Sequence, residues 1–471
     1  MLSLYFVLLV AACFISLKSA RYGLLSILFI GFSQDMFRKL VPGEPFYFVV
    51  LVGVVFAVVF LTTVSHVGAS RVLEPFTRWT RESRLPLLVF FSILIAQLIH
   101  SLLRYGNPFI SAIGLMSYIA PFFGIVVGYY SINNIGDIRR FMKAYIVFGM
   151  TVAASVLLSF TGWDFHIFKE VGEGLKIYDQ GSILRSFSGI MRTGEIAAWH
   201  IASATCMLVI LCLTSRSTLR LWLVAILIVF LLSAVALTGR RKMLMLFTTF
   251  SVALALGYMY LSNAIKISYM VSGSIILFAF WFSVVSFSPE GYGNYFENYL
   301  ARGVSVYSDA SSRFIELGID PVRWAYNRVG VLGGGLGIAS QGSRFFNVSS
   351  IAGGSAEGGF GKVMVELGLP GLIVIVWMMI TFVIYIYRAL RLSTHKKMQN
   401  NLMPLMLGLA TLLMVNIMTF SVATQVYGDM FVLITLGLLS GFLFALPKLI
   451  VNQLDSENML DTESVSITKA V

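Results

Sequence analysis

Long apolar runs recur from one end of this 471-residue chain to the other. Each run has about 17–20 residues, the length of an α-helix that crosses ~30 Å of hydrocarbon. Only 12% of the residues are charged, whereas a soluble domain has about a quarter. Inside lipid every backbone N–H and C=O must find a partner, and the runs do not alternate polar with apolar residues. The pattern therefore predicts helices and not the strands of a barrel.

The runs predict an all-α integral membrane protein with about 12–13 transmembrane helices. Residues 1–450 are expected to form one polytopic transmembrane domain, and the polar residues 451–471 a disordered cytoplasmic tail. The predicted spans are 2–17, 22–37, 46–64, 85–103, 110–130, 141–160, 197–213, 220–237, 243–261, 268–287, 369–387, 402–420 and 428–446.

Basic residues in the short loops predict the orientation of these spans. Lys18 and Arg21 follow the first apolar run, the reverse of a cleavable signal peptide, so the N-terminus is expected outside. The loops on the side of Lys18 and Arg21 hold most of the basic residues found in short loops, and this side is predicted to be cytoplasmic. Residues 161–196 then form an outer loop, and residues 288–368 form a long outer loop with short amphipathic helices.

The outer loops still contain basic residues, although the positive-inside rule disfavours them there. One interpretation is an ordinary solvated loop, and the other is an electropositive cavity for an anionic, membrane-anchored ligand. Arginine suits the second role because its guanidinium group makes forked hydrogen bonds to phosphate. Nucleic acid is not expected, since no basic and aromatic module lies off the membrane. The residues are Arg185 and Arg192; Arg240, Arg241 and Lys242; and Arg313, Arg323 and Arg344.

The long outer loop has the pattern of a short amphipathic helix that begins near Asp320-Pro321. Val322, Tyr326 and Val329 form its apolar stripe, so the helix is expected to lie on the outer leaflet. Trp324 either anchors this helix at the interface or stacks on a sugar ring.

Glycine-rich stretches follow at 333–337 and 353–361, without a Walker or Rossmann pattern. Glu357 lies in the second stretch, where it is either an exposed loop residue or a general base among cations. Metal-binding patterns are absent from the sequence, and no metal or cofactor is expected. Nor does a relay of carboxylates within the membrane stand out, of the kind that ion-coupled transporters often have.

Three segments resemble, in order, motifs of the O-antigen ligase and polymerase superfamily of bacterial envelope glycan enzymes. The resemblance covers residues 180–390. Ala356-Glu357-Gly358 stands where ligases of this superfamily usually carry a His-Asn pair, which favours a polymerase. The segments are Thr238-Gly-Arg-Arg-Lys242; Ser312-Arg313 followed by Gly330 to Gly337; and Glu366-Leu-Gly-Leu-Pro-Gly-Leu372.

The resemblance implies a lipid-dependent membrane glycosyltransferase fold, of the GT-C-like kind. It also implies a metal-independent polymerase in the bacterial inner membrane, which joins polyprenyl-pyrophosphate-linked oligosaccharide repeat units of a cell-surface polysaccharide at the periplasmic face. Partners would be the chain-length regulator and flippase of the same pathway. A ligase that transfers glycan to another acceptor, and a transporter or flippase for lipid-linked sugars, remain alternatives. The candidate catalytic residues are Glu357, Arg241 and Arg313, and the candidate substrate-binding residues are Arg185, Arg192, Arg240, Arg323, Arg344 and Trp324.

Overall fold

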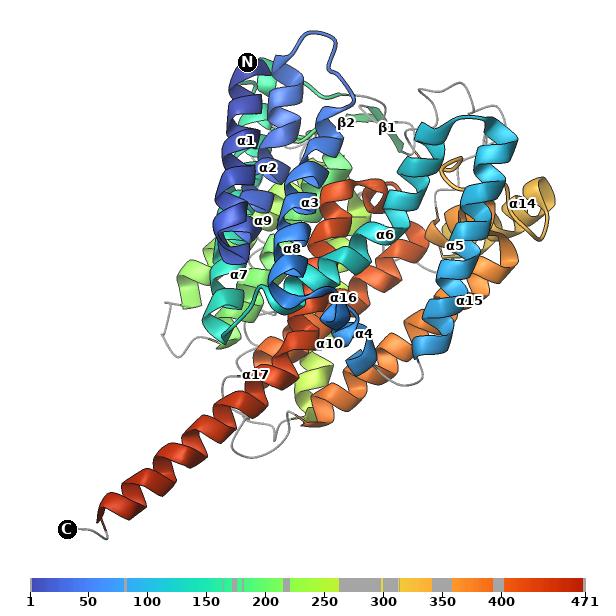
Figure 1. Cartoon of the computed structure of the whole chain (residues 1–471). Coiled ribbons are helices and arrows are strands. Elements are labelled where there is room, and N and C mark those ends of the chain that lie inside the picture. The colour runs from blue at the N-terminus through green and yellow to red at the C-terminus, as the bar shows by residue number, and fades with distance from the viewer. Residues whose placement is uncertain are drawn as a thin grey trace.

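The computed structural model describes most of the chain as a bundle of long helices (Figure 1). The described residues are 2–79, 83–163, 165–171, 176–179, 182–214, 221–261, 298–299, 312, 314–340, 358–392 and 402–468. The helices are α1 (Leu2–Lys18), α2 (Ala20–Leu40), α3 (Phe48–Val67), α4 (Glu74–Trp79), α5 (Arg84–Tyr105), α6 (Pro108–Tyr130), α7 (Ile135–Phe160), α8 (Gly194–Thr214), α9 (Leu221–Leu237), α10 (Arg241–Leu261), α14 (Asp320–Val329), α15 (Gly359–Leu392), α16 (Met403–Val422) and α17 (Met430–Thr468). Short elements are the 3-10 helices η1 (Ala69–Arg71), η3 (His166–Phe168) and η6 (Val426–Gly428), the π-helix η4 (Ile315–Ile319), and an antiparallel hairpin of β1 (Lys176–Asp179) and β2 (Ser182–Arg185).

The predicted all-α membrane architecture is confirmed at this level. Within the described residues, nine helices are long and apolar enough to cross a membrane: α3, α5, α6, α7, α8, α10, α15, α16 and α17. Helices α1 and α9 are apolar but shorter, and α2 carries charged residues in its first and last turns. Every predicted span inside the described residues coincides with a helix, whereas the span predicted at 268–287 lies outside them.

Contacts between helix ends place the loops at two opposite ends of the bundle, as the alternation of spans predicts. At one end, Lys39 of α2 donates to the Gly189 carbonyl, and Lys242 of α10 donates to the Val422 carbonyl at the end of α16. At the other end, Arg21 of α2 pairs with Asp137 of α7 at 3.4 Å. We call the first the long-loop end, because it carries residues 165–171, 182–193, 238–240, 314–340 and 423–429; it lies at the top of Figure 1.

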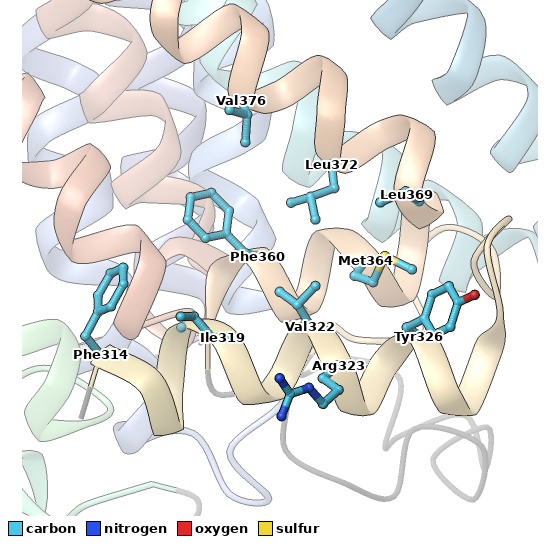
Figure 2. A pocket seen from close by; sticks show the side chains of 11 residues that line it. Phe314, Ile319, Val322, Arg323, Tyr326, Phe360, Met364, Leu369, Leu372 and Val376 are labelled. Atoms are coloured by element: carbon cyan, nitrogen blue, oxygen red, sulfur yellow. The ribbon is translucent and has the colours of Figure 1, made fainter. Parts of the chain in front are cut away.

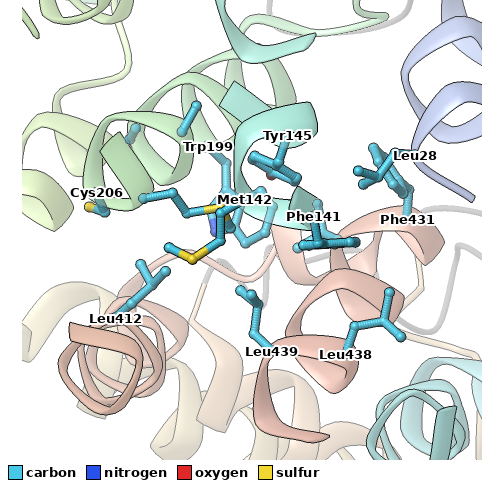
Figure 3. Close-up of a cluster of buried hydrophobic side chains, with 14 of the residues drawn as sticks. Leu28, Phe141, Met142, Tyr145, Trp199, Cys206, Leu412, Phe431, Leu438 and Leu439 are labelled. Carbon is cyan, nitrogen blue, oxygen red and sulfur yellow. The ribbon is translucent and has the colours of Figure 1, made fainter. Parts of the chain in front are cut away.

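Helices α8, α16 and α17 form the centre of the bundle. Of their apolar spans, 83%, 72% and 78% is buried, against 28% for α5 and for α10 at the periphery. Figure 3 shows the large side chains that fill this centre, with Trp199 of α8 near Phe141 and Tyr145 of α7 and Leu439 of α17. The core therefore positions the ends of α8 and α17, which both bear on the site described below.

Small residues allow α6 and α17 to cross closely. Gly124 and Gly128 of α6 face Gly437 and Gly441 of α17, and each pair is spaced four residues apart. A Cβ on Gly124 would lie 2.8 Å from the Gly437 Cα, and one on Gly437 would overlap the Pro121 carbonyl oxygen. Such small-xxx-small contacts replace the hydrophobic effect as the driving force between helices in lipid.

The glycine stretch at 333–337 serves as a packing element. Gly333, Gly335 and Gly337 have positive φ, and a Cβ on Gly337 would overlap the Ile110 carbonyl oxygen of α6. Side chains of α5 donate hydrogen bonds to the carbonyl groups of this stretch. The Tyr105 hydroxyl donates to the Gly334 carbonyl at 2.9 Å, and the Ser101 hydroxyl donates to the Leu336 carbonyl at 2.9 Å. The stretch thus fastens the end of α14 onto α5 and α6.

Helix α17 continues to Thr468, where the sequence led us to expect a disordered tail after residue 450. Figure 1 shows it projecting beyond the bundle toward the C-terminus. Neither glycine nor proline follows Pro447. The segment therefore lacks the residues that most strongly end a helix, although its composition is polar.

Candidate functional site

Four separate parts of the chain meet at the long-loop end: the last turns of α2, residues 186–193 before α8, the turn 238–240, and residues 423–429 before α17. Lys39 Nζ donates to the Gly189 carbonyl at 2.7 Å, which joins α2 to the segment 186–193. Ser186 Oγ donates to the Thr238 carbonyl at 3.0 Å, which joins that segment to the turn. Two of the three basic segments singled out in the sequence are therefore neighbours.

The segment 186–193 is held in one conformation by its own small and polar residues. Gly189 has φ +56°, and a Cβ there would overlap Ser155 Oγ of α7. Ser155 Oγ also accepts from the Ile190 N–H at 3.0 Å. Thr193 Oγ1 accepts from the Ile196 N–H at 3.4 Å, which caps the start of α8.

Arg192 lies between two buried aspartates. Its Nη2 is 2.8 Å from Asp429 Oδ2, its Nη1 is 3.7 Å from Asp35 Oδ1, and its backbone N–H donates to Asp35 Oδ2 at 3.1 Å. The side chains of all three residues are less than a tenth exposed. We predicted Arg192 as a substrate-binding residue, but the structure gives its guanidinium group internal partners, because acidic residues from α2 and the start of α17 fold against it.

Asp35 and Asp429 also correct the expectation that the membrane spans lack a group of carboxylates. Asp35 falls within the predicted span 22–37, and Asp429 falls at the start of the predicted span 428–446. Both lie toward the long-loop end of their helices and share Arg192. The sequence did contain a signal for this group, namely an isolated aspartate within an apolar run. A charged residue in lipid is costly, so such an aspartate indicates a paired or functional residue.

Glu170 follows η3 and was missed by the sequence reasoning. Both of its carboxylate oxygens are shielded from solvent, and neither accepts a hydrogen bond within the described residues. Burial raises the pKa of Glu170 to about 7, and the positive charges of Arg185, Lys39 and Arg240 oppose this shift. A single glutamate in a polar loop has no sequence signal that would have distinguished it.

The predicted arginines of the first two segments occupy this same region. Arg185 is exposed on β2, with its Cζ 5.4 Å from the Phe187 ring centre, and the Tyr299 hydroxyl donates to the Arg185 carbonyl. Arg240 is half-buried in the turn, and its N–H donates to Thr238 Oγ1 at 3.3 Å. Arg241 is the first residue of α10 and is buried. Cations from different elements thus gather around Glu170 and the segment 186–193.

A second feature of the long-loop end is an apolar groove between η4–α14 and α15 (Figure 2). Its volume is about 560 Å³. Val322 and Tyr326 line it from α14, so the predicted apolar stripe faces a groove, and Arg323 is the charged residue of the lining. The full lining is Phe314, Gly318, Ile319, Val322, Arg323, Tyr326, Phe360, Met364, Leu369, Leu372 and Val376.

The groove and the arginine turn contact the same end of α16. A Cβ on Gly318 in the groove would lie 3.9 Å from the Ser421 carbonyl oxygen. The neighbouring carbonyl, that of Val422, accepts from Lys242 Nζ at 2.7 Å. The contact made by the groove and the contact made by Lys242 therefore fall on two consecutive residues of α16.

Trp324 and Glu366 have structural partners. Trp324 is half-buried against Ala325, Ile338 and their neighbours and does not line the groove. Glu366 is fully buried, and its Oε1 accepts from the Ala339 N–H at 3.1 Å, which ties α15 to the end of the glycine stretch. Trp324 therefore packs against this small core, and its stacking on a sugar stays a prediction.

Three predicted residues, Arg313, Arg344 and Glu357, lie outside the described residues. Within the described ranges, histidine, cysteine and acidic side chains form no group that could hold a metal ion. Besides Arg192, the described residues place Arg185, Arg240, Arg241 and Arg323 at the long-loop end: Arg185 and Arg323 are exposed, Arg240 is half-buried, Arg241 is buried, and Arg323 lines the groove.

Comparison with known proteins adds no relative: no protein-family model matches this chain, and no curated protein does.

Proposed function

We propose that this protein is a membrane glycosyltransferase that polymerises polyprenyl-pyrophosphate-linked oligosaccharide repeat units of a cell-surface polysaccharide. The observation that carries the proposal is the gathering of Lys39, Arg185, Arg240 and Arg241 at the long-loop end of a multispan bundle. Basic residues are disfavoured at the end away from the cytoplasm, and a cluster of them there suits the binding of an anionic ligand. In this proposal the long-loop end is the periplasmic face of a bacterial inner membrane, and the bundle is of the GT-C-like kind.

The groove supports a lipid-linked substrate and not a soluble anion. A polyprenyl diphosphate sugar combines a long apolar tail, a diphosphate and a glycan. The groove is apolar apart from Arg323 and lies on peripheral helix α15, so a prenyl chain can enter it from the bilayer. Its contact with Ser421, next to the contact of Val422 with Lys242, brings the tail site near the cations.

The chemistry suits arginine. Transfer of the glycan leaves a diphosphate whose negative charge must be stabilised as the sugar–oxygen bond breaks, and fixed guanidinium groups supply that stabilisation. Arg241 also occupies the place of the arginine in the superfamily motif that Thr238 to Lys242 resembles. Arg192, whose charge is taken up by Asp35 and Asp429, is a positioning residue in this proposal.

A transporter of lipid-linked sugars is the second candidate, because of the buried Asp35–Arg192–Asp429 group. Buried carboxylates of this kind line ion pathways in many transporters. However, the three residues lie together at the long-loop end. This position favours a group that supports a site at the membrane surface, and it disfavours an ion pathway across the bilayer.

The test is a reconstitution of the purified full chain in nanodiscs with synthetic polyprenyl-pyrophosphate-linked repeat units. The expected product is a ladder of lipid-linked oligomers that lengthens with time. Arg241→Glu is expected to abolish the ladder, whereas Arg104→Glu, an exposed arginine at the same end, leaves it intact. Transfer of one unit to a different acceptor would indicate a ligase, and movement of substrate across a vesicle membrane without any transfer would indicate a transporter.

A further inference from the structure

Glu170 differs from the other buried carboxylates at the long-loop end. Asp429 has Arg192 and the Val432 N–H as partners, and Asp35 has the side chain and backbone of Arg192. Within the described residues, neither Glu170 oxygen accepts a hydrogen bond, and Glu170 takes part in no ion pair. A shielded carboxylate without hydrogen bonds is costly, and in a stable protein it calls for an explanation.

The position of Glu170 is fixed by the segment that carries Arg192. The Val171 N–H, next to Glu170, donates to the Arg192 carbonyl at 3.1 Å. Arg185 from β2, Lys39 from α2 and Arg240 from the turn act on the Glu170 carboxylate electrostatically. The carboxylate of Glu170 thus interacts electrostatically with cations that come from three other elements.

We propose that Glu170 is a catalytic residue, the base that accepts the proton of the acceptor hydroxyl group during glycan transfer. This inference rests on the proposed function. The acceptor oxygen forms a bond to the anomeric carbon of the donor as its O–H bond breaks toward Glu170. The bond from that carbon to the diphosphate oxygen breaks, and the polyprenyl diphosphate leaves with the electron pair. The proton then passes from Glu170 to water at the long-loop end.

The ionisation of Glu170 fits this role. Burial raises its pKa to about 7, so the carboxylate is both available and basic near neutral pH. Burial lowers the pKa of Lys39, one of the cations that act on Glu170, to about 8, so the titration of Lys39 affects the rate on the basic side. A rate that falls on the acidic side of pH 7 would therefore report Glu170.

The experiment measures initial polymerisation rates of the purified full chain in nanodiscs between pH 5 and pH 9. The wild-type rate is expected to fall about tenfold per pH unit below pH 7. Glu170→Gln is expected to lose about 100-fold or more in rate at pH 8, with no acidic limb in the remainder. Binding of the lipid-linked donor, followed by fluorescence, should change less than about twofold. Glu316→Gln, on exposed η4 at the same end, is the matched control and should behave as wild type.

If Glu170→Gln has the wild-type rate and the same fall in rate at acidic pH, the inference is overturned. The proposed function would still stand in that case, because the wild type makes polymer. A wild type that binds donor but makes no polymer would instead remove the proposed function. If Glu170→Gln does not fold, Glu170→Asp decides: it retains a carboxylate and should keep the acidic limb at a reduced rate. Loss of that limb in Glu170→Asp would contradict the assignment.

Discussion

The guanidinium group of Arg192 lies 2.8 Å from the carboxylate of Asp429, and both side chains are almost fully shielded from solvent. The contact joins the segment before α8 to the segment before α17, although 236 other residues separate them in sequence. Asp35 of α2 completes the group. Because one cation faces two carboxylates, the group supplies no spare positive charge. The group instead fixes the positions of the neighbouring cations and of Glu170.

Removing the cation of this group should destabilise the protein strongly. Arg192→Met leaves Asp35 and Asp429 buried without their counterion, a change that typically costs about 3–5 kcal/mol. Thermal unfolding in detergent should show a large fall in Tm, and Asp429→Asn should recover part of it by removing one charge. Equal Tm values for Arg192→Met and wild type would show that the contact does not hold the fold.

The close crossing of α6 and α17 should tolerate no larger residue. Gly437→Val would force its side chain into the Pro121 carbonyl and the Gly124 Cα, so the helices must separate and the yield of folded protein should fall. Gly53→Ala is the matched control, since its new Cβ would meet only Met430 Cγ at 3.9 Å. Size-exclusion chromatography in detergent measures both. A monodisperse, wild-type-like Gly437→Val would refute the crossing.

Glu170 should lower stability at neutral and basic pH. Its pKa is raised from 4.5 to about 7 in the folded protein, so between these values the folded state retains a proton that the unfolded state has lost. The free energy of unfolding therefore falls as pH rises through this window. Glu170→Gln should have a smaller loss of Tm between pH 4.5 and pH 8 than wild type, and Glu316→Gln the wild-type loss. An identical pH dependence for Glu170→Gln and wild type would mean that the carboxylate is not perturbed.

Filling the groove should affect donors with long lipid tails selectively. Val322→Trp places a large ring between α14 and α15, which should raise KM at least several-fold for a long-chain polyprenyl donor and much less for a short-chain analogue. Leu332→Trp is the control, because Leu332 is exposed and does not line the groove. Steady-state kinetics with both donors check this. An equal change in KM for the two donors would place the tail elsewhere.

The spans and the two faces of the bundle could be predicted because both follow from local sequence. An apolar run of membrane length predicts a helix, and the count of spans between two loops predicts whether they share a face. That reasoning correctly placed Arg185 and Arg240 at the same end. It also identified the apolar stripe of α14, because the spacing of Val322 and Tyr326 depends only on helical geometry.

The partners of charged residues could not be predicted, because they depend on which helices are neighbours. Arg192 had the sequence context of an exposed interfacial arginine, and only the packing of α2 and α17 brings Asp35 and Asp429 to it. Glu170 is shielded in the folded chain and charges from β2, α2 and the turn 238–240 act on it, and no local sequence pattern records that arrangement. The glycines at 333–337 indicated close approach of backbones, but not that α5 and α6 are the neighbours.

The central claim is that cations from separate segments bind one lipid-linked diphosphate at the long-loop end. The most direct measurement is the affinity of the purified full chain in nanodiscs for polyprenyl diphosphate, compared with the uncharged polyprenol of the same length. The account predicts that the diphosphate binds at least about tenfold more tightly, and that Arg240→Gln with Arg241→Gln removes this preference while Arg104→Gln retains it. Equal affinities for the two lipids, or a preference that survives the double substitution, would contradict it.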